Sequence, residues 1–384
     1  MSDTTSGPVL AADGKPLKAS LNRALRRQKM RALMLIAPLL LFILVSFVMP
    51  IADMLFRSVE NQVVTDTLPR TTQEIANWDG EGIPDEAVFN ALARDFAVAV
   101  EIKAHTRLGS RLNYEMTGIS SLFRKSGRGV SDIGEVSQDA LEDLDEAWEE
   151  PATWITMMAD PAWISAQADW QADKTAYEAA EAERVALLRA EAAAEQEAAE
   201  AAGREFDMPS IQPERWEVAE PAFRLGSQAA ALPQTAELYA DFAAAHQSKG
   251  DSPIDEDAWP ILYEMVVSDL ANGAPTDGFD AETAALLAAV PATDIAQTDF
   301  KAAFIDIDDD WGNHEVWSTI STYSSAYTNG YFLNSVDRLK GAEGVEMRPE
   351  NEQIYIVLFV RTMIMSLSIM GMCVLLGYPI AWLL

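Results

Sequence analysis

Two apolar stretches decide the fold of this chain: LMLIAPLLLFILVSFVMPIA at residues 33–52 and TMIMSLSIMGMCVLLGYPIAWLL at residues 362–384. The first holds 20 residues and the second 23, and neither contains a charged side chain. At about 1.5 Å of rise per residue, each makes a helix of about 30 Å or more, which matches the hydrocarbon thickness of a bilayer. The sequence therefore predicts two transmembrane helices, one near each end.

A secretory signal peptide is the alternative for the first stretch. More than 30 residues precede it, its apolar run exceeds a normal signal core, and no A-x-A cleavage site follows. Pro38 and Pro50 would be costly in a soluble helix but are tolerated in membrane helices. We therefore expect an uncleaved anchor.

The orientation of the helices follows from the distribution of basic residues. Seven Lys and Arg precede the first stretch, whereas only Arg57 and Arg70 closely follow it. Because basic flanks stay in the cytoplasm, the amino terminus is expected inside and the large middle region outside. This divides the chain into a cytoplasmic basic tail (1–32), transmembrane helix 1 (33–56), an acidic extracytoplasmic domain (57–353) and a last segment with transmembrane helix 2 (354–384).

Arg361 stands at the start of the second stretch, after the apolar residues 354–360. An amphipathic segment lying along the membrane surface, with Arg361 reaching to the headgroups, fits this layout. The alternative is a helix that begins near Ile354 and buries Arg361 against partners. Cys373, the only cysteine, is expected to be a packing residue of this helix.

The middle region is strongly acidic. Residues 58–353 hold 19 Lys and Arg against 57 Asp and Glu, within a whole-chain charge of −32. Such a surplus argues against nucleic-acid binding, which needs clustered basic residues. Solubility of an exported domain accounts for the charge, and attraction of cations is the alternative.

The composition of the middle region predicts a mostly helical domain. Residues 174–203 are nearly all strong helix formers with few large apolar residues, so we expect a solvated arm or loosely packed hairpin there. A stripe of large side chains at spacings of three and four is more typical of a packed helix face than of a ligand site. Its members are Trp317, Ile320, Tyr323, Tyr327 and Tyr331.

No pattern in the sequence predicts catalysis or a metal site. Counted from Asp306, the acidic run FIDIDDDWG places tryptophan at the sixth and twelfth positions, where an EF-hand needs Gly and Glu. A turn that caps the next helix is the better interpretation. His105, His246 and His314 have no metal-binding spacing, and phosphate-binding and nucleophile motifs are missing from the sequence. We therefore expect a protein that is not an enzyme and needs no cofactor.

The two ends of the chain carry a family resemblance. APLLLFILVSFVMPIADMLFRSV at residues 37–59 resembles the opening helix of binding-protein-dependent ABC transporter permeases. WGNHEVWSTI at residues 311–320 and the last 31 residues resemble the start of the permease core in the spermidine/putrescine-type subfamily. The latter similarity lies in Arg361-Thr362, the serines at 366 and 368, Gly377-Tyr378-Pro379 and Ala381.

The resemblance implies a subunit of a multi-pass importer in the bacterial inner membrane. Its partners would be a cytoplasmic ATPase, a second permease subunit and a periplasmic solute-binding protein, and its solute would be polyamine-like. Gly377 and Pro379 would allow a kink or close helix packing. In such permeases a cytoplasmic loop with an E-A-A…G signature docks the ATPase, and this chain ends before any such loop. The sequence is therefore expected to be the amino-terminal portion of a longer protein. The alternative is a membrane-anchored extracytoplasmic interaction or sensor protein.

Overall fold

The computed structural model describes residues 29–30, 34–57, 59–341 and 344–383, and it is mostly helical. The chain divides into two compact units. The helical domain comprises residues 61–326 together with residues 341 and 344. The apolar-helix unit comprises the described parts of residues 1–60, 327–340 and 345–384.

The first apolar helix runs from Met34 to Arg57. Its middle turn, η1 (Leu44–Val48), is a π-turn, and α2 (Met49–Arg57) continues it. Pro50 explains the wider turn, because proline lacks an N–H and its ring clashes with the carbonyl four residues earlier. The Met49 N–H accordingly donates to the Leu44 carbonyl, five residues back.

The second apolar helix, α17 (Tyr355–Leu383), is a single continuous helix. It includes Arg361 and the residues just before it, so the helix begins close to Ile354, and whether its first turns lie along a membrane surface stays a prediction. Before α17 come α16 (Gly330–Ser335) and a two-stranded sheet of β1 (Arg338–Gly341) and β2 (Gly344–Met347). This short hairpin was not predicted, since each strand holds only four residues and so short an alternation is a weak signal.

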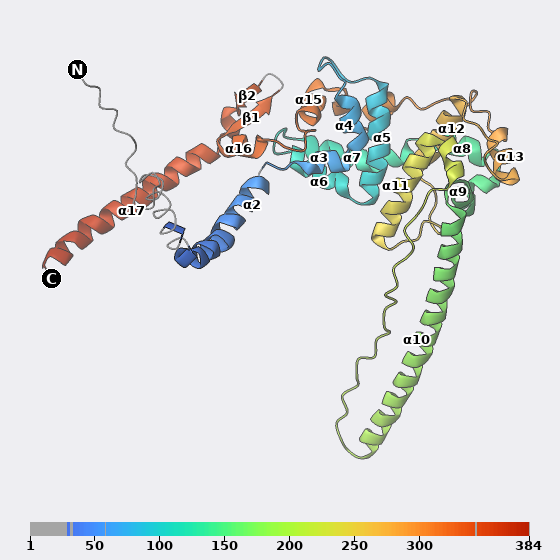
Figure 1. The fold of residues 1–384 in the computed structure, drawn as a ribbon, viewed down its shortest axis with the longest axis horizontal. Helices are drawn as coiled ribbons and strands as arrows, with labels where there is room; N and C mark the ends of the chain where they lie inside the picture. The colour runs from blue at the N-terminus through green and yellow to red at the C-terminus, as the bar shows by residue number, and fades with distance from the viewer. Residues whose placement is uncertain (1–28, 31–33, 58, 342–343, 384) are drawn as a thin grey trace, which may run out of the picture. The chain divides into compact units, whose positions relative to one another are not determined.

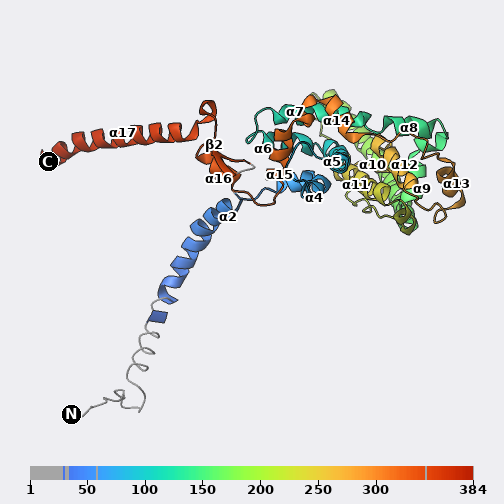
Figure 2. The same ribbon diagram turned by 90° about the horizontal axis from the view of Figure 1, so that it is seen from above.

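The helical domain is built from thirteen α-helices within the described residues. They are α3 (Gln62–Thr67), α4 (Pro69–Ile75), α5 (Glu86–Glu101), α6 (Ala104–Leu112), α7 (Ile119–Gly129), α8 (Glu135–Glu142), α9 (Pro151–Met158), α10 (Pro161–Ala201), α11 (Pro233–Lys249), α12 (Pro260–Ala271), α13 (Ala281–Ala289), α14 (Phe300–Ile307) and α15 (His314–Thr322). In both views α4, α5 and α15 lie together, as do α9, α11 and α12 (Figures 1 and 2).

Aromatic side chains fill the core of the helical domain. Around α5, the rings of Phe89 and Trp317 meet edge to face with centroids 4.7 Å apart. Around α9 and α12, Trp154 and Tyr263 meet in the same way at 4.9 Å. Both groups belong to one continuous buried core. Large buried aromatic area of this kind stabilises a domain without disulfides.

The stripe of large side chains near residue 320 is divided in the structure. Trp317, Ile320 and Tyr323 are buried in the core, as expected of a packed helix face. α15 ends at Thr322, however, so Tyr327 and Tyr331 do not continue the same face, and Tyr327 is exposed. The interpretation as a packed face is confirmed for the first three residues and is wrong for the last two.

The first and last residues of the helical domain are joined directly. The Asn61 backbone N–H donates to the Ala326 carbonyl at 2.8 Å. The Asn61 side-chain Nδ2 donates to the carbonyls of Tyr323 at 2.6 Å and Ser325 at 3.1 Å. The domain therefore begins and ends at one place.

The helix expected near residues 174–203 is the outer part of α10, which projects away from the other helices of the domain (Figure 1). An extended segment, residues 204–222, then runs back alongside it (Figure 1). We call the two together the α10 hairpin. Trp170 Nε1 donates to the Val218 carbonyl at 3.0 Å, and the Glu214 N–H donates to Glu181 at 2.6 Å. Within the described chain, the main core receives no side chain from residues 165–222.

The outer part of the α10 hairpin, residues 182–213, should be removable without loss of stability. Because Glu181 contacts Glu214, residues 182–213 can be replaced by two glycines. We expect the melting temperature, followed by circular dichroism, to change by no more than about 3 °C. Trp154→Ala, which empties a core position, should lower stability by about 3–5 kcal/mol and serves as the contrast. Equal losses in the two variants would contradict a separately packed hairpin.

Candidate functional site

The site residues predicted in the second apolar helix all lie on α17. Arg361 is exposed and has no hydrogen-bond or ion-pair partner among the described residues. It lies six residues after the start of the helix, which is about 9 Å along the axis. Such a position lets a long basic side chain extend toward a membrane surface.

Gly377 and Pro379 lie near the carboxyl end of α17. The helix continues through Pro379 to Leu383 without a break. A Cβ placed on Gly377 would meet no atom within 4 Å. Within the described chain this face is therefore open, and a neighbouring helix could approach its backbone closely.

Asp337 forms the best-defined polar contact of the apolar-helix unit. One carboxylate oxygen accepts from the Ile354 and Tyr355 N–H groups at 3.1 and 2.9 Å, and the other accepts from Ile356 at 2.7 Å. These are free donors of the first turn of α17. Burial alone would raise the pKa of Asp337, but the three N–H donors outweigh it and hold the pKa below its usual value.

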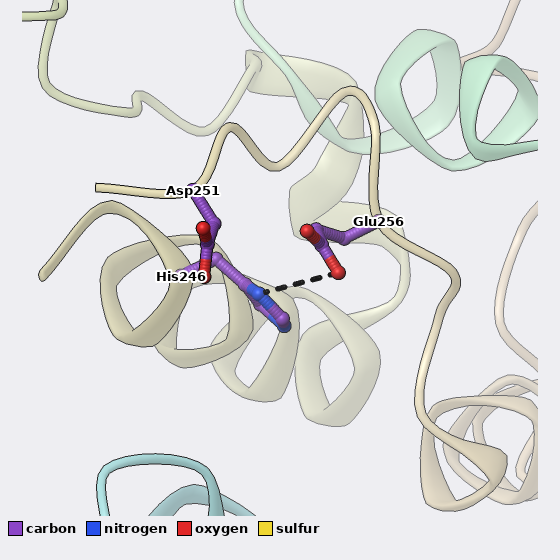
Figure 3. Close-up of side chains that lie close together, drawn as sticks. All are labelled: His246, Asp251 and Glu256. Carbon is purple, nitrogen blue, oxygen red and sulfur yellow. Dashed lines mark ion pairs between the residues drawn. The ribbon is translucent and has the colours of Figure 1, made fainter. Parts of the chain in front are cut away.

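A second cluster, formed by His246, Asp251 and Glu256, lies in the helical domain and was not predicted. His246 belongs to the last turn of α11, and the two acids lie on the loop between α11 and α12 (Figure 3). Gly250, with φ of 88°, ends the helix in the left-handed region that favours glycine. That turn brings the chain back, and the Asp251 N–H donates to the His246 carbonyl at 3.1 Å.

The imidazole of His246 is buried and has no hydrogen bond. Only 4% of the residue is exposed, and neither ring nitrogen has a hydrogen-bond partner. Its Nδ1 lies 3.8 Å from Glu256 Oε2, and its Nε2 lies 4.0 Å from Glu101 Oε2. Burial lowers the pKa of His246 below its usual value despite these carboxylates, so the ring is neutral at pH 7.

Lys249 provides the positive charge beside this cluster. Its Nζ makes a short contact with Glu101 and lies 3.4 Å from Asp251 Oδ2. Glu101 also accepts from Trp259 Nε1 at 3.2 Å. Three carboxylates thus surround one neutral imidazole and one ammonium, which leaves a local surplus of negative charge.

The spacing of the cluster explains why sequence reasoning missed it. His246, Asp251 and Glu256 are five residues apart, which matches no helical metal motif. The only available signal was a histidine one turn before a helix-ending glycine, followed by an acidic loop. The acidic run near 308, by contrast, is the predicted capping turn, since Asp308 accepts from the Asp310 N–H at 3.1 Å.

Comparison with protein-family models, with curated proteins and with solved structures finds no match for this chain.

Replacing Asp337 should loosen the first turn of α17. In Asp337→Ala we expect lower hydrogen-exchange protection factors for the amides of residues 354–356, because three N–H groups lose their acceptor. The folded pKa lies below the unfolded one, so the stabilisation is complete above the unfolded pKa of about 3.9 and is lost as the pH falls through the folded value.

The control for this variant is Glu350→Gln, which removes a nearby exposed acid. Its protection factors should equal those of the wild type at pH 7. Wild type and Asp337→Ala should converge at low pH. A persistent difference there would contradict a carboxylate cap.

Proposed function

We propose that the chain is part of the permease subunit of an ABC importer that moves a small, polyamine-like solute across the bacterial inner membrane. The observation that carries the proposal is the sequence pattern of residues 354–384, which resembles the start of a permease core of the spermidine/putrescine type. Its Arg361-Thr362, Gly377-Tyr378-Pro379 and Ala381 lie on one apolar helix.

The exposure of both apolar helices supports this proposal. Met34–Arg57 and Tyr355–Pro379 are long and apolar enough to cross a bilayer, and the described residues bury none of their apolar windows. Surfaces of this kind need lipid or other helices around them. In a permease the remaining helices of the bundle would supply that cover, and Gly377 would offer one close contact.

In this proposal the helical domain is an insertion between the first two membrane helices. Because the Asn61 N–H donates a hydrogen bond to the Ala326 carbonyl, the first and last residues of this insertion lie next to each other. The seven basic residues ahead of the first apolar helix, against only Arg57 and Arg70 closely after it, support a periplasmic location by the positive-inside rule.

The chain itself performs no chemical step in this proposal. A cytoplasmic ATPase would drive alternating access, a second permease subunit would complete the pathway, and a periplasmic binding protein would deliver the solute. Gly377 and Pro379 would permit the helix packing that such movement needs.

An anchored extracytoplasmic interaction or sensor protein is the second candidate. It is favoured by the size of the helical domain, which has its own core and the α10 hairpin. The coding sequence beyond codon 384 separates the two candidates. Further apolar spans with an E-A-A…G loop are expected for the permease, whereas a stop codon directly after Leu384 would contradict it.

Cysteine labelling tests the proposed topology. In a Cys373→Ala background, which removes the only thiol, Glu195→Cys places a thiol on the exposed outer part of α10 and Ser20→Cys places one in the basic tail. A membrane-impermeant maleimide should label Glu195→Cys in intact spheroplasts and Ser20→Cys only after lysis.

Two results would contradict this topology. Labelling of Ser20→Cys in intact spheroplasts would show that the amino terminus lies outside, opposite to the proposed orientation. A mature protein whose mass lacks the first apolar helix would identify that helix as a cleaved signal sequence.

A further inference from the structure

The buried imidazole of His246 has no hydrogen-bond partner for either ring nitrogen. Buried polar groups are almost always hydrogen-bonded, because desolvation without a partner destabilises the fold. Neither nitrogen of His246 is satisfied, although carboxylates of Glu101 and Glu256 stand within 4.0 Å. At 3.8–4.0 Å these atoms are too far apart to hydrogen-bond.

The separation of the ligand atoms suits an ion placed between them. One atom from each of His246, Asp251 and Glu256 lies within 4.8 Å of the others. Zn²⁺ binds nitrogen and carboxylate oxygen at about 2.0–2.2 Å, so neighbouring ligands of a tetrahedral site are roughly 3.3 Å apart. The Nδ1–Oε2 distance of 3.8 Å needs only a small movement of Glu256, whose side chain is 39% exposed on its loop. Asp251 is likewise half-exposed and lies on the same loop.

The charge around the cluster also favours a cation. His246 lies in the last turn of α11, and Glu101 is the last residue of α5. The carboxyl ends of both helices carry partial negative charge that adds to the three carboxylates. Lys249 neutralises part of this charge and would compete for Asp251.

We propose that His246, Asp251 and Glu256 bind a divalent transition-metal ion of the Zn²⁺ class in the helical domain. The imidazole nitrogen selects zinc and similar ions over Mg²⁺ and Ca²⁺, which prefer sets made only of oxygen. Three protein ligands leave a fourth position for water, because Glu101 lies beside the other ring nitrogen of His246. The site lies where α11 meets the following loop, so the ion ties the loop to the helix.

The alternative is a histidine that is simply packed against its aromatic neighbours. The rings of Phe242 and His246 have centroids 4.5 Å apart, and Trp259 lies at 6.1 Å. A histidine held only by this packing takes up no metal. Binding of Zn²⁺ therefore distinguishes the two.

The experiment uses the full chain in detergent, purified with a tag that lacks histidine and stripped with EDTA. Zn²⁺ is titrated against a chromophoric chelator, with Mg²⁺ and Ca²⁺ titrated separately. We expect one Zn²⁺ site per chain, lost in His246→Gln and weakened at least about tenfold in Glu256→Gln. Asp255→Asn, which removes the same charge one residue away, and His105→Gln should bind as the wild type does.

Several results would overturn the proposal. These are no Zn²⁺ uptake by the wild type, equal uptake by Glu256→Gln and Asp255→Asn, or Ca²⁺ bound as tightly as Zn²⁺. Glu256 is partly exposed, so its variant decides the question even where His246→Gln fails to fold. Circular dichroism of each variant records folding, and the outcome is independent of whether the chain takes part in transport.

Discussion

The contacts of Asn61 join the two ends of the helical domain. This residue is almost fully buried, and its amide and backbone hold the turn after α15 through three hydrogen bonds. Buried donors that lose their acceptors are costly, so the closure is strongly maintained. Both ends of the domain are thus joined to each other, and its aromatic core contains no residue of the two apolar helices among the residues described.

Those parts of the structure that follow from composition were predictable. The two apolar helices were confirmed because 20 or more uncharged residues in a row have few other structures available. The mostly helical middle region was confirmed because helix formers dominate it and strand alternation is scarce. Long, uniform signals of this kind survive the influence of tertiary packing.

The parts that depend on a turn were not predictable. The stripe from Trp317 was extended to Tyr331 because spacing alone does not reveal that α15 ends at Thr322. Asp337 caps α17 from 17 residues upstream, and no local pattern marks such a distant acceptor. His246 meets Asp251 and Glu256 only because Gly250 adopts a positive φ and turns the chain back. In each case one residue in a loop decides which side chains meet, and loop geometry is poorly encoded in residue spacing.

The extended half of the α10 hairpin has a consequence for the integrity of the molecule. Residues 204–222 are largely exposed and have no regular secondary structure, so they are an accessible site for proteases. A cut there would separate α5 from α11 in the chain but not in space, because both helices contribute to the same core. The two fragments would stay associated and folded. A doublet on a denaturing gel would then report a nicked but native protein.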